Sequence, residues 1–142
     1  MRTSAVSRLG AFVSASALAA TALISAASPA SAATSCYAST CQGKDPATTV
    51  CQNDARTVAT SGWGLLELRY SPTCRAVWAR FKTDTPYAVS ITVQRNDGNG
   101  TYSAHYRGDG TPVWTAMVND KDLQSRACEY WDDGRSDCTD WY

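Results

Sequence analysis

The sequence has 142 residues, with 13 basic and 13 acidic side chains and a formal net charge of zero. The length fits a single domain. The basic residues form no run along the chain, which disfavours nucleic acid and anionic membrane surfaces as partners, because both are bound through concentrated positive charge.

The first 32 residues have the features of a secretory signal peptide. Arg2 and Arg8 make the start basic, residues 9–27 follow without a charge, and Ala30 and Ala32 flank a cleavage site of small residues. Several hydroxyl side chains and a proline interrupt the apolar stretch, which argues against a membrane-spanning helix. We predict that residues 1–32 are a signal peptide cleaved after Ala32.

Cleavage would leave one secreted, extracellular domain over residues 33–142. Removing 32 of the 142 residues leaves 110, and the loss of two arginines leaves 11 basic against 13 acidic side chains, a net charge of −2. A domain of this size has a thin core, so crosslinks would help to stabilise it. We expect no membrane attachment after cleavage.

An even number of cysteines follows the predicted cleavage site, which is typical of a disulfide framework in a short exported chain. Chain proximity favours Cys128–Cys138, and then Cys51–Cys74 with Cys36–Cys41 left over, although six cysteines allow about 15 pairings. A zinc site is disfavoured because the chain has no C-x-x-C pair and a single histidine. We therefore expect no metal or cofactor. The candidate disulfide cysteines are Cys36, Cys41, Cys51, Cys74, Cys128 and Cys138.

The chain from residue 33 to residue 70 changes from loop to strand. Residues 33–49 contain turn-forming residues and few core-sized side chains, which predicts a loop. Residues 50–60 are compatible with either a strand or one short helix. Residues 66–70 alternate apolar and charged side chains, which indicates a half-buried strand.

A hairpin is predicted next, because residues 76–81 follow the turn at residues 71–73 and alternate loosely. In this interpretation Ala76, Trp78 and Phe81 share one face. Residues 87–94 alternate more strictly and predict another strand. Further strands are predicted over residues 101–106, 113–118 and 125–131. About six or seven short strands with polar turns predict an all-β fold, a small disulfide-stapled antiparallel sandwich or barrel.

Two acidic segments are candidate cation sites. Residues 97–100 suit a hairpin turn. A calcium loop that starts at Asp97 would have Thr101 at its fifth position and Gly108 at its twelfth, where carboxylates are needed. The acidic residues between 132 and 140 fit a solvated tail, with a cation site as the alternative.

Several runs of residues together are similar to one bacterial family. The sequence resembles the domain-of-unknown-function family 2690, which includes YjfA-like secreted proteins. The likeness is densest between residues 36 and 81, and it implies an exported or extracytoplasmic module without an assigned activity. The residues that carry the resemblance are Cys41-Gln42-Gly43-Lys44-Asp45-Pro46, Cys51, Glu67-Leu68-Arg69-Tyr70-Ser71 and Cys74-Arg75-Ala76-Val77-Trp78-Ala79-Arg80.

Tryptophan is abundant in this chain, with five residues. Large aromatic side chains fill thin β cores, and exposed ones supply binding surfaces. We expect Trp78 and Trp114 in the core and the other three partly exposed. The candidate ligand surface comprises Trp63, Trp131, Trp141, Asp132 and Asp133.

Catalysis has weak support in the sequence. His105 is the only histidine, and the chain lacks the G-x-S-x-G nucleophile motif. A carboxylate pair for glycoside cleavage would need Glu67 or Glu129 together with an aspartate, and both glutamates lie in predicted strands. Structural roles are favoured for all three, so no catalytic residue is predicted.

The sequence thus favours a secreted, non-catalytic binding or interaction domain. Its partner would be an extracellular protein or a glycan. One alternative is a small secreted hydrolase that uses His105 or a carboxylate pair. Another is a structural component of the cell envelope or spore coat.

Overall fold

The computed structural model describes residues 32–82 and 84–142. All but the last residue of the predicted signal peptide lies outside these residues. In the described part of the chain, helices occur only as short 3-10 turns, and none of them is long and apolar enough to cross a membrane.

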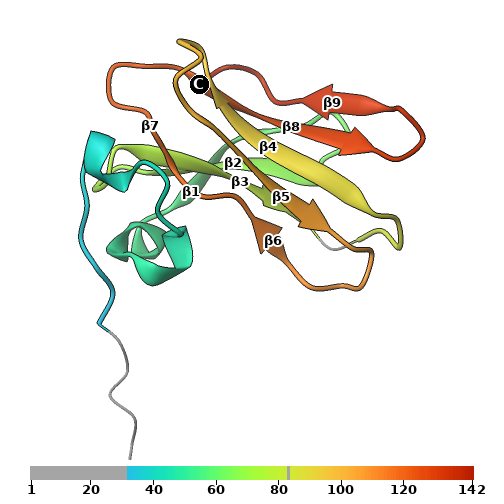
Figure 1. Cartoon of the computed structure of the whole chain (residues 1–142), viewed down its shortest axis with the longest axis horizontal. Helices are drawn as coiled ribbons and strands as arrows, with labels where there is room; N and C mark the ends of the chain where they lie inside the picture. Colours follow the sequence, from blue (N-terminus) through green and yellow to red (C-terminus); the bar gives the residue numbers. More distant parts are fainter. Residues whose placement is uncertain (1–31, 83) are drawn as a thin grey trace, which may run out of the picture. The chain divides into compact units, whose positions relative to one another are not determined.

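The described residues form nine strands in two antiparallel sheets (Figure 1). The first sheet has the order β1-β2-β3-β6, with β7 also paired to β3, and the second has the order β5-β4-β8-β9. The strands are β1 (Arg56–Thr60), β2 (Leu66–Ser71), β3 (Ala76–Phe81), β4 (Val89–Arg95), β5 (Thr101–Tyr106), β6 (Val113–Trp114), β7 (Val118–Asn119), β8 (Ser125–Trp131) and β9 (Ser136–Cys138).

The predicted all-β, disulfide-stapled sandwich is confirmed, with nine strands in place of six or seven. The single strand predicted over residues 113–118 was wrong, because the backbone leaves β3 between β6 and β7. There the Met117 N–H donates to the Lys44 carbonyl at 2.9 Å, outside the sheet. The segment 50–60 contains both of its predicted alternatives, since η3 (Val50–Asn53) precedes β1.

The main core lies between the two sheets and follows the period-2 alternation of the strands. Burying these side chains contributes roughly 25 cal/mol per Å² of apolar surface removed from water. Gly108 lies in the bend that follows β5 and has a φ of 76°. A Cβ at this position would lie 2.2 Å from the Pro86 carbonyl oxygen, so only glycine fits. The buried members of the core are Leu66, Leu68, Tyr70, Val77, Ala79, Phe81, Val89, Ile91, Val93, Tyr106, Val118 and Ala127.

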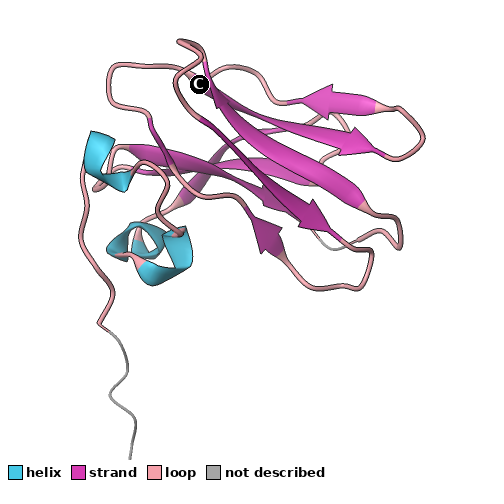
Figure 2. Cartoon of the chain, in the orientation of Figure 1, coloured by secondary structure: helices cyan, strands magenta, loops and turns pink. Residues whose placement is uncertain are grey.

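A second buried cluster covers the outer face of the first sheet. Three 3-10 turns, η1 (Ala38–Cys41), η2 (Pro46–Thr48) and η3, precede the strands (Figure 2). The Cys51–Cys74 disulfide ties this layer to the turn after β2, and the Cys36–Cys41 disulfide closes a loop within the layer. Because the main core covers the other face, β3 is buried on both faces. The cluster comprises Cys41, Cys51, Cys74, Ala76, Trp78 and Met117.

The disulfides have the pairing that chain proximity favours. The third bond, Cys128–Cys138, joins opposite positions on β8 and β9, whose Cα atoms lie 4.0 Å apart. The described chain contains no free cysteine.

Two sequence predictions about the first sheet need correction. Phe81 faces the main core with Val77, whereas Ala76 and Trp78 face the 3-10 layer. Trp78 is buried as expected, but Trp114 is 39% exposed because β6 has only two residues and lies at a sheet edge. Trp63 and Trp141 are exposed and Trp131 is half-buried, as expected.

Asp120 connects the two sheets. It follows β7, and its carboxylate accepts a hydrogen bond from the Ser125 hydroxyl at the start of β8 at 2.7 Å. Burial raises the pKa of Asp120 to about 6, against the lowering effects of Ser125, Arg75 and Arg95. Ionisation of Asp120 is therefore less favourable in the folded protein than in the unfolded chain.

We predict that Asp120→Asn stabilises the protein at neutral pH. The folded pKa lies above the ordinary value of 3.8, so the stability that Asp120 contributes is complete below about pH 4 and is lost as pH rises through about 6. The variant should exceed the wild type by on the order of 2–3 kcal/mol at pH 7 and by little at pH 4, measured by urea denaturation. The same difference at both pH values would contradict this prediction.

Candidate functional site

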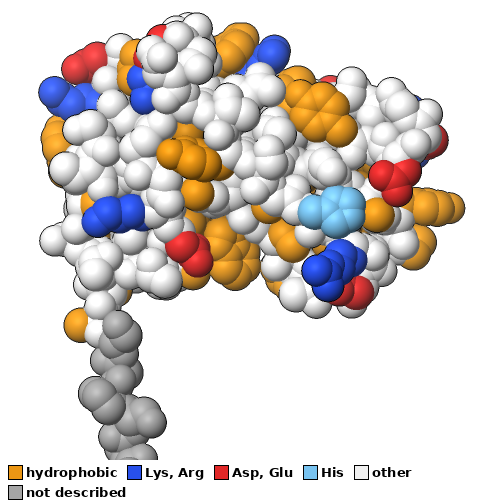
Figure 3. Space-filling view, viewed as in Figure 1, with side chains coloured by type: hydrophobic (Ala, Val, Ile, Leu, Met, Phe, Trp, Pro, Cys, Tyr) orange, Lys and Arg blue, Asp and Glu red, His pale blue; other side chains and the backbone are white. Residues whose placement is uncertain are grey.

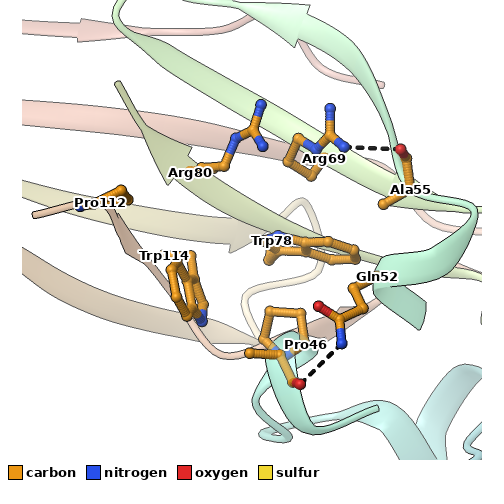
Figure 4. A pocket seen from close by; sticks show the side chains of 9 residues that line it. Pro46, Gln52, Ala55, Arg69, Trp78, Arg80, Pro112 and Trp114 are labelled. Atoms are coloured by element: carbon orange, nitrogen blue, oxygen red, sulfur yellow. Dashed lines mark hydrogen bonds between the residues drawn. The ribbon is translucent and has the colours of Figure 1, made fainter. Parts of the chain in front are cut away.

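A cleft of about 270 Å³ opens between the outer face of β3, the 3-10 layer and β6 (Figure 4). A second hollow of the same volume adjoins it and shares Arg80 and Pro112 with it. We call the first hollow the Trp78–Trp114 cleft. It is lined by Pro46, Ala47, Gln52, Ala55, Arg69, Trp78, Arg80, Pro112 and Trp114.

The two tryptophans are held rigidly. Trp78 packs into the disulfide cluster and is 4% exposed. Trp114 pairs with Arg80 across the strands, and its indole N–H donates to the Asp45 carboxylate at 2.8 Å. The same carboxylate oxygen accepts from the Ala47 N–H at 2.9 Å and so caps η2. Asp45 thereby fixes both the turn and the exposed ring at the cleft.

Arg69 brings a cation to the cleft from β2. Its guanidinium donates to the Thr57 hydroxyl and to the Ala55 carbonyl, each at 2.8 Å. In the described ranges, 32–82 and 84–142, no carboxylate lies within ion-pair distance of the Arg69 guanidinium. Burial and the charge of Arg80 lower the pKa of Arg69, and the charge of Glu67 opposes them. The group stays charged, because arginine is protonated at any ordinary pH.

Arg80 is the second cation, and it is paired. Its Nε and Nη2 atoms lie 2.8 and 2.5 Å from Glu67 Oε2, and Lys82 Nζ lies 3.5 Å from Oε1. Burial would raise the pKa of Glu67, but the hydrogen bond and charge of Arg80, with the charges of Lys82 and Arg69, hold it below its ordinary value. Three cations therefore surround one carboxylate on this face.

Gln52 adds a neutral polar group to the cleft. Its amide nitrogen donates to the Ala47 carbonyl at 3.0 Å, as the dashed line in Figure 4 shows. Its amide oxygen accepts no hydrogen bond from the described residues, so it is available to a ligand. The cleft thus combines aromatic walls, guanidinium donors and one amide acceptor, which is the composition of a site for a polar ligand.

The predicted ligand surface is only partly assembled in the fold. The rings of Trp63 and Trp131 meet edge to face, with their centroids 5.7 Å apart. The guanidinium carbon of Arg135 lies 5.3 Å from the Trp63 ring centroid and 5.0 Å from the Trp131 ring centroid. Asp133 accepts from Arg135 at 2.7 Å, and with Asp132 it lines a hollow of about 350 Å³ beside Trp131. Ligand binding there stays a prediction.

Trp141 does not line that hollow. The Arg126 guanidinium lies 4.6 Å from its ring centroid, on the outer side of β8. The acidic segment is also dispersed, since Asp137 accepts from the Cys138 N–H and Asp133 pairs with Arg135. Among the described residues, the carboxylates of this segment do not gather into a group that could hold a cation.

His105 lies on the exposed face of β5, and the single histidine is visible at the surface in Figure 3. Its Nδ1 atom is 3.2 Å from the Ser90 hydroxyl on β4. Asp109 lines the same shallow hollow, but its carboxylate accepts from the Thr111 N–H at 2.9 Å. In the part of the chain that the structure describes, no carboxylate hydrogen-bonds His105, so a Ser-His-Asp triad lacks its third member.

The two glutamates do not face each other across a cleft. Glu67 points to the outer face of the first sheet, whereas Glu129 is fully buried and shares the inner face of β8 with Ala127. Burial and the charge of Asp137 raise the pKa of Glu129, although Ser61, Trp131 and Arg135 act against them. Neither glutamate is placed to pair with an aspartate for glycoside cleavage, because Glu67 is ion-paired with Arg80 and Lys82 and Glu129 is closed off from solvent.

Sequence reasoning did not find the Trp78–Trp114 cleft. Its residues come from five segments, and Trp114 was assigned to the core. The available signal was the alternation of residues 66–70, which places Arg69 on the face opposite Leu68, next to Trp78 across the hairpin.

Searches of curated proteins and of solved structures each found no match to the chain. A comparison with protein families matched residues 39–128 to the family described as "Protein of unknown function (DUF2690)". The matched segment covers well over half of the 142 residues and includes every residue that lines the Trp78–Trp114 cleft. The chain therefore belongs to the DUF2690 family.

Proposed function

We propose that this chain is a secreted, non-catalytic binding module whose Trp78–Trp114 cleft binds an acidic glycan. The observation that carries the proposal is the charge of the cleft. Its lining, all from the described part of the chain, contains two arginines and no carboxylate. Arg80 pairs with Glu67, but no carboxylate of the described residues lies within ion-pair distance of Arg69. An anionic ligand would supply the missing charge through guanidinium hydrogen bonds.

The shape and chemistry of the cleft favour sugar rings. Trp114 presents an exposed ring that Asp45 holds in place, and such a surface suits the apolar face of a sugar. The amide oxygen of Gln52 can accept from a ligand hydroxyl. The adjoining hollow of about 270 Å³ shares Arg80 and Pro112 and is also lined by Lys82 and Asp84, so a further ring of a polymer could bind beside the cleft.

Two observations support secretion. Three disulfides connect all six cysteines, and such bonds persist in oxidising compartments. The N-terminal sequence has the basic, apolar and small-residue pattern of a signal peptide. Three crosslinks also give a small domain the rigidity that a binding surface requires.

We predict that the protein binds oligogalacturonate through the cleft and that Trp114→Ala weakens this binding by roughly tenfold, about 1.4 kcal/mol. The substitution removes the exposed stacking surface. Isothermal titration calorimetry should show weaker affinity in high salt, because salt screens the attraction to Arg69 and Arg80. The methyl-esterified oligomer keeps the rings but loses the carboxylates, and it should bind more weakly.

Trp141→Ala is the matched control, because Trp141 is 40% exposed and Trp114 is 39% exposed. It should leave the affinity unchanged. If Trp63→Ala abolishes binding while Trp114→Ala does not, the ligand lies at the other aromatic surface and the cleft assignment is wrong. Preference for an acidic peptide over the glycan would contradict the ligand class.

Secretion predicts a defined mass for the exported protein. Intact-mass spectrometry of culture-medium protein should show a chain that begins at Ala33 and has lost six hydrogen atoms through its three disulfides. Retention of residues 1–32, or six free thiols in native material, would refute this part of the proposal.

One contact favours the alternative of a small hydrolase, namely that between Ser90 and His105 at 3.2 Å. The pair lies on an open sheet face without a carboxylate to orient the imidazole, so we expect an unactivated serine. A fluorophosphonate probe, with labelling followed by peptide mass spectrometry, should leave Ser90 unmodified. Labelling that His105→Ala abolishes would establish the hydrolase instead.

A further inference from the structure

Two of the disulfides are in direct contact. Cys36 Sγ lies 3.4 Å from Cys51 Sγ, and Cys41 Sγ lies 4.0 Å from the same atom. These are contacts between different disulfides, Cys36–Cys41 and Cys51–Cys74. All four sulfur atoms lie within 4.8 Å of one another. We call this group the four-sulfur cluster.

The four-sulfur cluster is assembled from separate segments and is enclosed. Cys41 ends η1, Cys51 lies in η3 and Cys74 lies in the turn between β2 and β3. These three are fully buried, while Cys36 is half-buried. Trp78 and Met117 pack around the group and exclude water. Such an arrangement leaves one approach, at Cys36.

The sulfur spacing matches a tetrahedral metal site. Zinc–sulfur bonds of about 2.3 Å place the four ligands of a tetrahedron roughly 3.8 Å apart. Two contacts between the disulfides, at 3.4 and 4.0 Å, lie on either side of this spacing, and all four sulfur atoms lie within 4.8 Å of one another. Breaking the disulfides would let each bonded pair, whose Cα atoms lie 5.1 and 5.6 Å apart, separate by rotation about its side-chain torsions.

We propose that the four-sulfur cluster, once reduced, is a structural site for one Zn²⁺ bound by Cys36, Cys41, Cys51 and Cys74. A dithiol reductant supplies two electrons and two protons to each disulfide and becomes a disulfide itself, so two equivalents yield four thiols. Zn²⁺ then displaces the four thiol protons and forms four Zn–S bonds.

The ligand set selects the type of metal. Four thiolates in a tetrahedron suit zinc, whereas calcium and magnesium require oxygen ligands. Four protein ligands would fill the tetrahedron and leave no position for a water or substrate. Three of the four ligands are also fully buried, so the ion would act as a structural crosslink. The bound ion would therefore hold the 3-10 layer against β3 in the reduced protein, as the disulfides do in the oxidised protein.

Cobalt binding tests this proposal, because Co²⁺ occupies zinc sites and reports their ligands by its absorption. The full chain is reduced with a phosphine under anaerobic conditions and titrated with Co²⁺. We expect saturation at one equivalent, thiolate-to-cobalt charge-transfer bands, the visible bands of tetrahedral Co²⁺, and their loss when Zn²⁺ is added. Zn²⁺ should raise the melting temperature of the reduced protein and leave that of the oxidised protein unchanged.

The remote cysteines provide a matched control. A variant with Cys128→Ser and Cys138→Ser lacks the other disulfide and should give the same spectrum and stoichiometry. A variant with Cys36→Ser and Cys41→Ser should lose the tetrathiolate bands. If the reduced control variant gives no tetrathiolate spectrum, whether it is folded or unfolded, the proposal is overturned. An equal spectrum from both variants would also overturn it, because the cluster would not be the ligand set.

Discussion

The Cys51–Cys74 disulfide, with Cys36–Cys41 packed against it, holds the N-terminal part of the domain against the first sheet. Residues 34–55 form short turns with few large apolar side chains, so hydrophobic burial alone would hold them weakly. The cysteines replace those missing anchors and pack directly on Ala76, Trp78 and Met117. As a consequence β3 is covered on both faces, and the first sheet has a second layer over its outer side.

That second layer also creates the cleft. Pro46, Gln52 and Ala55 line the cleft from the layer, and the strand residues Arg69 and Arg80 complete it. The hairpin register places Arg69 beside Trp78 and Glu67 beside Arg80, so the cations collect on the outer face. The buried acids Asp120 and Glu129 belong to other parts of the domain, and burial favours their neutral forms. Neither of them lines the cleft, so Glu67 is the carboxylate that opposes the positive charge there.

Alternating sequence patterns predicted those parts of the fold that are buried on one face. Residues 66–70 and 87–94 alternate cleanly, and both form strands with the expected inward side chains. The pattern failed for β3, because a strand that is buried on both faces has no polar face to mark its orientation. It also failed for Trp114, whose two-residue edge strand is too short to show a period. In both cases the missing information was the position of the 3-10 layer.

The cleft and the four-sulfur cluster were beyond sequence reasoning for the same reason. Neither has a local motif: the cysteine spacing contains no C-x-x-C pair, and the cleft residues are spread from Pro46 to Trp114. Both arise only when the disulfides and the hairpin register bring distant segments together. Sequence separation was enough to predict which cysteines are paired. It could not predict that two of the disulfides touch, because that contact depends on how the 3-10 layer packs.

The cleft and the cluster are physically coupled, because η2 lies between Cys41 and Cys51. Reduction without a replacement crosslink would free the segment that carries Pro46 and would separate Asp45 from the Trp114 ring that it holds. A single zinc ion tied to the same four cysteines would restrain the same backbone positions as the two disulfides. The geometry of the cleft would then depend on whether the four positions are joined, and much less on whether sulfur–sulfur or sulfur–zinc bonds join them.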